Sequence, residues 1–195
     1  MTVTFSSSLR LNDKMEKQTE SAYIQRILSG EINIFSVFVE QHHRSVYALI
    51  RQMALSNEDA EELTQDVFLK AFEKLHSFKG DCSFSTWIYR IAYNTAVSYT
   101  RKKRLIFPSI DDAMIENIKE ETVDAFFEEE NQQKMEKLTV AMQKLNIEEK
   151  TLVALFYTDN KSIVEIGLIS GLSTENVKVK LFRIRKKIFK LMTEQ

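Results

Sequence analysis

The sequence FSTWIYRIAYNTAVSYTRKKR, residues 84–104, combines an apolar helical stripe with several aromatics and a cationic end. Its apolar and small residues recur at intervals of three and four, the spacing of one helix face. They are Ile88, Ile91, Ala92, Thr95, Ala96 and Tyr99. A buried helix needs this stripe but not the four consecutive cations that end it. The stretch therefore predicts a core helix that also presents a surface to a polyanion.

Three further aromatics, Trp87, Tyr89 and Tyr93, lie near Arg90 and Asn94. Exposed rings can stack on unpaired bases, which is worth about 1–3 kcal/mol per base. For any single ring, the sequence does not distinguish between packing in the core and contact with a base. The group as a whole favours single-stranded nucleic acid.

The composition predicts an all-α protein. The 195 residues include only four Gly and one Pro, which favours helices joined by short turns, and no stretch reads as a strand. The length suits one or two domains. The 27 basic and 28 acidic side chains nearly cancel, but they are unevenly placed. Basic blocks at residues 79–104 and 161–190 flank an acidic run at 111–130, so the chain can dock a polyanion twice.

Several classes of protein are excluded by what the sequence lacks. Cys82 is the only cysteine, which rules out a disulfide framework and a thiolate zinc cluster. No apolar run approaches the roughly 20 residues of a membrane span. The first residues do not form a secretory signal, so we expect a cytoplasmic protein without membrane insertion. The helical pattern begins near Thr19, which suggests Met15 rather than Met1 as the native start.

We expect two small helical domains joined by an acidic linker. Pro108 and the acidic run mark the linker. The predicted divisions are a disordered extension at 1–19, a first domain at 20–104, the linker at 105–131 and a second domain at 132–195. Helices are predicted near residues 20–29, 32–54, 58–75, 84–104, 132–145, 148–157, 162–169 and 173–191, with Ser56 or Asn57 capping the third.

The stretch SIVEIGLISGLSTENVKVKLFRIRKKI, residues 162–188, predicts a helix-turn-helix. Ser162 and Glu165 have the spacing of a capping box. Gly171 supplies the positive φ of a tight turn, and Ser173 or Thr174 caps the second helix. The basic faces of that second helix fit a major groove. The alternative is an amphipathic helical hairpin with a solvated basic face.

The order of these segments resembles the sigma-70 family of bacterial transcription initiation factors. The resemblance is carried by DAEELTQDVFLKAFEKL at 59–75, by FKGDCSFSTWIYRIAYNTAVSYTRKKR at 78–104, and by VKVKLFRIRKKI at 177–188 after the acidic linker. It points to the extracytoplasmic-function (ECF) group, which keeps only regions 2 and 4, and covers about residues 30–104 and 134–191. The implied function is to bind core RNA polymerase and direct initiation at promoters with −10 and −35 elements.

The resemblance implies a role for each matching position. The helix that binds the β′ clamp coiled coil of the polymerase is matched by Asp59, Glu62, Leu63, Gln65, Asp66 and Phe68. The residues that match contacts to the −10 element are Lys79, Phe84, Thr86, Trp87, Arg90, Asn94, Arg101, Lys102 and Arg104. Tyr89 and Tyr93 join this set as the aromatic stacking candidates described above. The −35 element is met by Ser173, Thr174, Asn176, Lys178, Lys180, Arg183 and Lys186. The second domain is also expected to meet the β flap, and an anti-sigma factor is an expected partner. No catalytic residue, metal or cofactor is implied.

Four positions depart from the family pattern. Ser98 stands where Asp is frequent, Val179 where Ser is common, and Ile184 where Ala is common. Gly167 replaces the usual Ala and is expected to loosen its helix by about 1 kcal/mol. The departures in the last helix bear on which −35 sequence is read rather than on its role.

Two other classes of function compete with this one. A regulator that binds duplex DNA as a dimer would give a palindromic footprint without polymerase, but nothing in residues 30–104 resembles a receiver or ligand pocket. An enzyme would need a catalytic constellation, and the carboxylates near Asp59 have neither a Gly-rich loop nor a His partner. His42 and His43 are adjacent, so they point to different helix faces and form a poor metal pair. We therefore expect no enzymatic activity.

Overall fold

The computed structural model describes residues 19–103 and 132–193. These two ranges are helical and contain no strand, which confirms the predicted all-α class. The predicted N-terminal extension, apart from Thr19, and all of the predicted linker lie outside the described residues. The chain divides into two compact units between Ala96 and Val97, within helix α4. The predicted domain limits stay a prediction, and each unit is described by itself.

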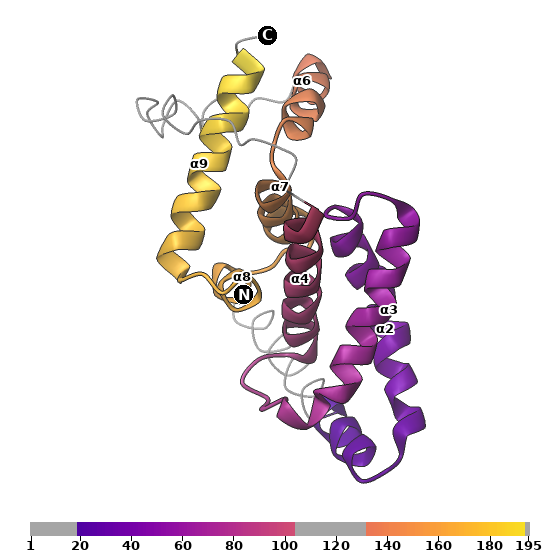
Figure 1. The fold of residues 1–195 in the computed structure, drawn as a ribbon. Coiled ribbons are helices and arrows are strands. Elements are labelled where there is room, and N and C mark those ends of the chain that lie inside the picture. Colours follow the sequence, from indigo (N-terminus) through magenta and orange to yellow (C-terminus); the bar gives the residue numbers. More distant parts are fainter. Residues whose placement is uncertain (1–18, 104–131, 194–195) are drawn as a thin grey trace. The chain divides into compact units, whose positions relative to one another are not determined.

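The first unit is built on helices α2, α3 and α4 (Figure 1). A helix over residues 19–28 precedes a 3-10 turn at Ile32–Ile34, which leads into α2 at Phe35–Arg51. Helix α3 spans Asn57–Glu73 and is followed by a 3-10 turn at Leu75–Ser77, and α4 spans Phe84–Lys103. The single helix predicted over 32–54 is thus shorter at both ends.

Large apolar side chains from each of these helices form the core of the first unit. Those with almost no exposed surface are Phe38, Val46, Leu49, Ile50, Met53, Val67, Leu75, Phe84 and Ile88. Full burial of one such side chain contributes about 1.5–3 kcal/mol. The Phe38 and Phe84 rings, with centroids 4.2 Å apart, join α2 to α4, and Lys70 Nζ lies 3.4 Å from Thr95 Oγ1 between α3 and α4.

The cap of α3 is local and was predicted. Ser56 Oγ accepts a hydrogen bond from the backbone amide of Asp59 at 3.0 Å, so Ser56 rather than Asn57 is the cap. Glu58 and Asp59 place negative charge in the first turn, where the helix dipole favours it.

The second unit packs the long helix α9 against three shorter ones. Helix α6 spans Gln132–Gln143, α7 spans Ile147–Val153, α8 spans Ile163–Ser170 and α9 spans Thr174–Thr193. A π-helical turn at Ala154–Thr158 continues α7, where the sequence predicted ordinary α-helix. Helix α9 contacts α6, α7 and α8, and its stripe of Val177, Leu181, Ile184, Ile188 and Met192 is buried.

The predicted helix-turn-helix is confirmed at α8 and α9. Ser162 and Glu165 form a reciprocal capping box, with Glu165 N to Ser162 Oγ at 3.2 Å and Ser162 N to Glu165 Oε2 at 2.9 Å. Gly171 has a φ of +76°, a left-handed conformation that glycine adopts without strain. Ser173 Oγ accepts from the Asn176 amide at 3.2 Å and caps α9.

Gly167 has a packing role that the sequence did not indicate. It is buried in α8, and a Cβ added there would lie 2.9 Å from the backbone oxygen of Leu172. The turn of the helix-turn-helix approaches α8 more closely than an alanine allows. The expected loosening of the helix stays a prediction, and the missing side chain also makes room for the turn.

Candidate functional site

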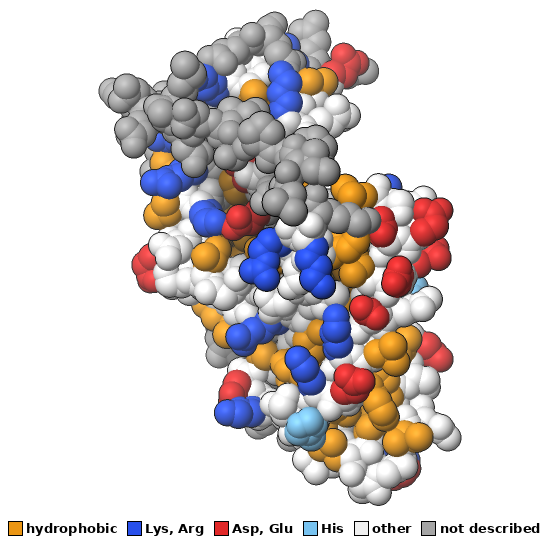
Figure 2. All heavy atoms as spheres, viewed as in Figure 1, with side chains coloured by type: hydrophobic (Ala, Val, Ile, Leu, Met, Phe, Trp, Pro, Cys, Tyr) orange, Lys and Arg blue, Asp and Glu red, His pale blue; other side chains and the backbone are white. Residues whose placement is uncertain are grey.

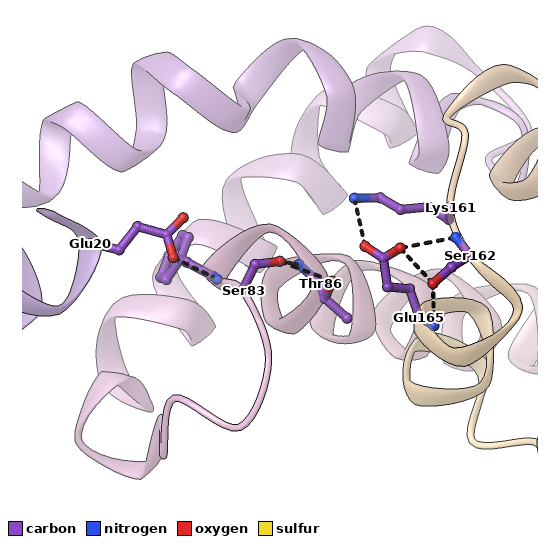
Figure 3. Close-up of polar contacts among 7 residues, drawn as sticks. Glu20, Ser83, Thr86, Lys161, Ser162 and Glu165 are labelled. Atoms are coloured by element: carbon purple, nitrogen blue, oxygen red, sulfur yellow. Dashed lines mark hydrogen bonds and ion pairs between the residues drawn. The ribbon is translucent and has the colours of Figure 1, made fainter. Parts of the chain in front are cut away.

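The N-terminus of α4 is held by side chains from two segments (Figure 3). The Phe84 amide donates to Glu20 Oε2 at 3.2 Å, and the Thr86 amide donates to Ser83 Oγ at 3.2 Å. The first amides of a helix lack partners within the helix, so these two bonds satisfy groups that would otherwise need water. Ser83 Oγ also lies 3.0 Å from Thr86 Oγ1. The start of α4 is thereby fixed to the helix over residues 19–28.

An aromatic cluster supports the loop that precedes α4. The Phe78 ring centroid lies 6.0 Å from that of Phe84 and 5.3 Å from that of Trp87, and the Phe84 and Trp87 centroids are 5.6 Å apart. Lys79 and Asp81 are exposed at the tip of this loop, on either side of Gly80 with its φ of +76°. The loop thus presents a polar tip on an apolar base.

The predicted −10 residues separate into exposed and buried groups. Arg90, Asn94, Arg101 and Lys102 are exposed on α4, and Figure 2 shows basic side chains over this helix. Trp87 is half-buried, while the predicted contacts with little exposed surface are Phe84, Thr86, Tyr89 and Tyr93. Arg104 lies outside the described residues.

The stacking hypothesis for Tyr89 and Tyr93 does not fit this structure. Their exposed fractions are 3% and 6%, so they present no free ring face to a base. Tyr99, predicted to be core, is only half-buried. The buried surface of α4 is wider than one helical stripe, because it contains Tyr89 and Tyr93 as well as Ile88, Ala92 and Ala96.

The predicted polymerase-binding residues also lie on two sides of α3. Glu62, Gln65 and Asp66 are exposed, Asp59 is half-buried, and Leu63 and Phe68 belong to the core. Figure 2 shows acidic side chains gathered over the first part of this helix.

Sequence reasoning missed a further surface residue on α3. Leu69 is 62% exposed and follows Gln65 and Asp66 by four and three positions, so it shares their face. This helical spacing is the sequence signal that could have identified Leu69 as a surface residue. It places one large apolar side chain beside an exposed carboxylate and an amide.

The predicted −35 residues lie on α9. Ser173, Asn176, Lys178 and Arg183 are exposed. Thr174, Lys180 and Lys186 are half-buried. Each of the two lysines has a partner: Lys180 forms an ion pair with Glu148 of α7, and the Lys186 ammonium lies 4.6 Å from the centroid of the Phe182 ring.

Glu175 was also missed, although it lies in the first turn of α9. Hydrogen bonds from its own backbone and from the Thr174 hydroxyl, at 2.9 Å, lower the pKa of its carboxyl group. The exposed face of α9 therefore carries a negative charge among its cations at neutral pH.

A third missed feature, an ion pair, fixes α9 to α7. Lys187 Nζ lies 2.9 Å from both carboxylate oxygens of Glu149, and the two side chains are only 13% and 16% exposed. Glu149 also accepts from the Asn146 amide at 2.8 Å, which completes a capping box at the start of α7. One carboxylate thus caps one helix and anchors another.

The histidines behave as adjacent helical residues should. His42 is buried and His43 is exposed, so they face in different directions. Within the described ranges, no three His, Cys, Asp or Glu side chains gather as metal ligands do. No helix in the described part of the chain is long and apolar enough to cross a bilayer.

Comparison with known protein families matches both units. Residues 38–106 match Sigma-70 region 2, and residues 135–188 match Sigma-70, region 4. The chain is an ECF sigma factor of the sigma-70 family. As a sigma factor it binds core RNA polymerase and directs promoter-specific transcription initiation.

Curated relatives match this sigma factor over most of both chains. It is 28% identical over 182 residues to the ECF RNA polymerase sigma-E factor of Haemophilus influenzae, covering 89% of this chain and 95% of the relative. It is 29% identical over 180 residues to the protein of that name from Escherichia coli, covering 89% and 94%.

Solved structures show the same fold. CnrH, in complex with the cytosolic domain of CnrY, has a TM-score of 0.63 at 20% identity, covering 90% of this sigma factor and 98% of CnrH. The sigma factor RpoE of Bartonella quintana, in complex with the anti-sigma factor NepR, has a TM-score of 0.58 at 18% identity, covering 82% and 96%.

Proposed function

We propose that the two units recognise different parts of a promoter. The first unit opens the −10 element and holds unpaired bases of the non-template strand, and the second reads the −35 element as duplex DNA. The observation that carries this division is that two helices, α4, which begins in the first unit and continues past Ala96, and α9 of the second unit, each have exposed basic side chains beside a face packed into a core. Phosphates can therefore be neutralised at two places.

In the first unit and along the rest of α4, which continues past Ala96, we assign DNA contact to the exposed side chains and support to the buried ones. The loop tip at Lys79 and the exposed part of α4 meet the DNA, with Trp87 as the ring that retains some accessible surface. The contacts on α4 are Arg90, Asn94, Arg101 and Lys102, followed by Arg104. Phe84, Thr86, Tyr89 and Tyr93 hold these groups in place. Pocket and stacking contacts offset the few kcal/mol needed to unpair a base.

For the polymerase, we assign contact with the β′ clamp coiled coil to the exposed face of α3. Glu62, Gln65 and Asp66 provide polar groups, and Leu69 adds an apolar contact. Asp59 lies at the edge of this exposed face, while Leu63 and Phe68 pack the opposite face of α3 into the core. The second unit meets the β flap.

In the second unit, the exposed face of α9 enters the major groove. Ser173, Thr174, Asn176, Lys178, Arg183 and Lys186 are the assigned −35 contacts, and Lys180 is considered separately because Glu148 holds it. Each unit alone binds weakly. The polymerase keeps both on one scaffold, so binding of one unit raises the effective concentration of the other.

Membership of the sigma-70 family also supports proposals about where the protein acts and what controls it. We propose that the protein acts in the cytoplasm, that it is not an enzyme, and that an anti-sigma factor controls it. The fold shared with RpoE of Bartonella quintana supports the last point, since that sigma factor is in complex with the anti-sigma factor NepR. The domain limits proposed for these roles are residues 20–104 and 132–195.

Run-off transcription with core RNA polymerase and a genomic promoter library tests the proposal. Holoenzyme should initiate at a selected set of sites, while free protein should give no specific gel shift at physiological salt. Failure to join core polymerase, or unchanged start sites, would refute the function. A palindromic footprint formed without polymerase would favour a dimeric regulator instead.

A further inference from the structure

Val179 interrupts the polar face of α9. Its side chain is 47% exposed, although the neighbouring Val177 and Leu181 are buried. Glu175 and Arg183 lie four residues before and after it, so they share its side of the helix. Both are exposed. A branched apolar side chain thus occupies the middle of a face whose other exposed side chains are charged or amide groups, with the half-buried Phe182 three positions further on.

Isolated apolar residues are common on protein surfaces and have no meaning by themselves. Val179 is different because it lies on the helix face that is assigned to the major groove. A valine there cannot hydrogen-bond to a base edge, and it would remove water from any polar group that it covers. The apolar group that the major groove offers is the C5 methyl of thymine.

We propose that Val179 reads a thymine methyl group in the −35 element and so determines part of its sequence. This inference rests on the proposed role of α9. Arg183, one turn further along, is free to contact guanine or phosphate, and Asn176, one turn before, can bond to adenine. Val179 then selects thymine at the base pair between their contacts.

Deoxyuridine tests the proposal directly, since it differs from thymine only by the missing methyl group. Holoenzyme first selects −35 sequences from a randomised library with a fixed −10 element. Each selected thymine is then replaced in turn by deoxyuridine, and holoenzyme binding is measured. One replacement should weaken wild-type binding by about fourfold, the effect expected for burying one methyl group.

The same replacement should have almost no effect on Val179→Ala holoenzyme, because the apolar partner is already gone. Val140→Ala is the matched control: Val140 is 40% exposed on α6 and lies outside the assigned contacts. That variant should keep the full deoxyuridine penalty. Thermal unfolding of both variants should match the wild type, as both side chains are exposed.

Three results would overturn the inference. In the first, no selected thymine responds to loss of its methyl group. In the second, the penalty persists in Val179→Ala. In the third, Val179→Ala weakens assembly with core polymerase equally on thymine and deoxyuridine templates, which would make Val179 a protein contact. Selection of no −35 sequence at all would instead refute the proposed role of α9, and is recognised at the first step.

Discussion

Glu20 and Phe84 are joined across 64 positions of the chain by a hydrogen bond from the Phe84 amide to Glu20 Oε2. The helix over residues 19–28 thereby caps the helix that carries the proposed −10 surface. Its effect is to fix where α4 begins, and with it the loop that ends at Ser83. A side chain remote in sequence thus positions the residues assigned to unpaired DNA.

Glu20→Ala should lower the free energy of unfolding of the first unit by about 1 kcal/mol, the usual effect of losing a helix cap. Glu20→Gln keeps an acceptor oxygen and should lose less. Trp87 is the only tryptophan, so its fluorescence during urea unfolding reports on this unit alone. Binding of holoenzyme to a −10 fork should also weaken, with −35 binding unchanged. The control is Glu40→Ala on the exposed face of α2, and equal effects at both positions would contradict the capping role.

The caps show how far the sequence could be used to predict the structure. Ser56, the Ser162–Glu165 pair and Gly171 were all predicted, because their partners lie within about one helical turn. Glu20 and the Glu149–Lys187 pair were not, because their partners lie 64 and 38 positions away. Local patterns cannot identify which distant segment folds against a given helix end.

The buried face of the aromatic helix differs from the prediction for a related reason. The spacing of Ile88, Ala92 and Ala96 predicts a single stripe, which leaves Tyr89 and Tyr93 to the surface. Helix α4 contacts both α2 and α3 and is buried over a wider arc than one stripe. Periodicity predicts the centre of a buried face well, whereas its width depends on how many neighbours the helix has.

Glu149→Ala should lower the free energy of unfolding of the second unit by about 2 kcal/mol. It removes both a helix cap and an ion pair that is largely shielded from water. Amide hydrogen exchange along α9 should rise more than exchange along α8, since Lys187 loses its anchor. Glu136→Ala, at an exposed position of α6, is the matched control. Unchanged exchange in α9 would show that this pair does not hold the helix.

Glu148→Gln should strengthen −35 binding by the holoenzyme. In the free protein Glu148 pairs with Lys180, so removing the carboxylate charge frees a cation for phosphate. The slope of log affinity against log salt should then become steeper by up to about 0.9, the effect of one added phosphate contact. Lys180→Ala should remove that gain in the double variant. An unchanged slope in Glu148→Gln, together with a shallower slope in Lys180→Ala alone, would mean that Lys180 already contacts phosphate in the wild type.

Gly167→Ala should destabilise the second unit, although alanine is the better helix former by about 1 kcal/mol. The new Cβ would lie 2.9 Å from the Leu172 backbone oxygen, so the turn between α8 and α9 would have to move. Overpacking of this kind typically costs about 1–3 kcal/mol, which exceeds the gain in helix propensity. Thermal unfolding followed by the NMR signals of α8 and α9 measures the change, with Val164→Ala at an exposed position of α8 as the control. A rise in stability would mean that the turn relaxes without cost and that the close approach at Gly167 does not require glycine.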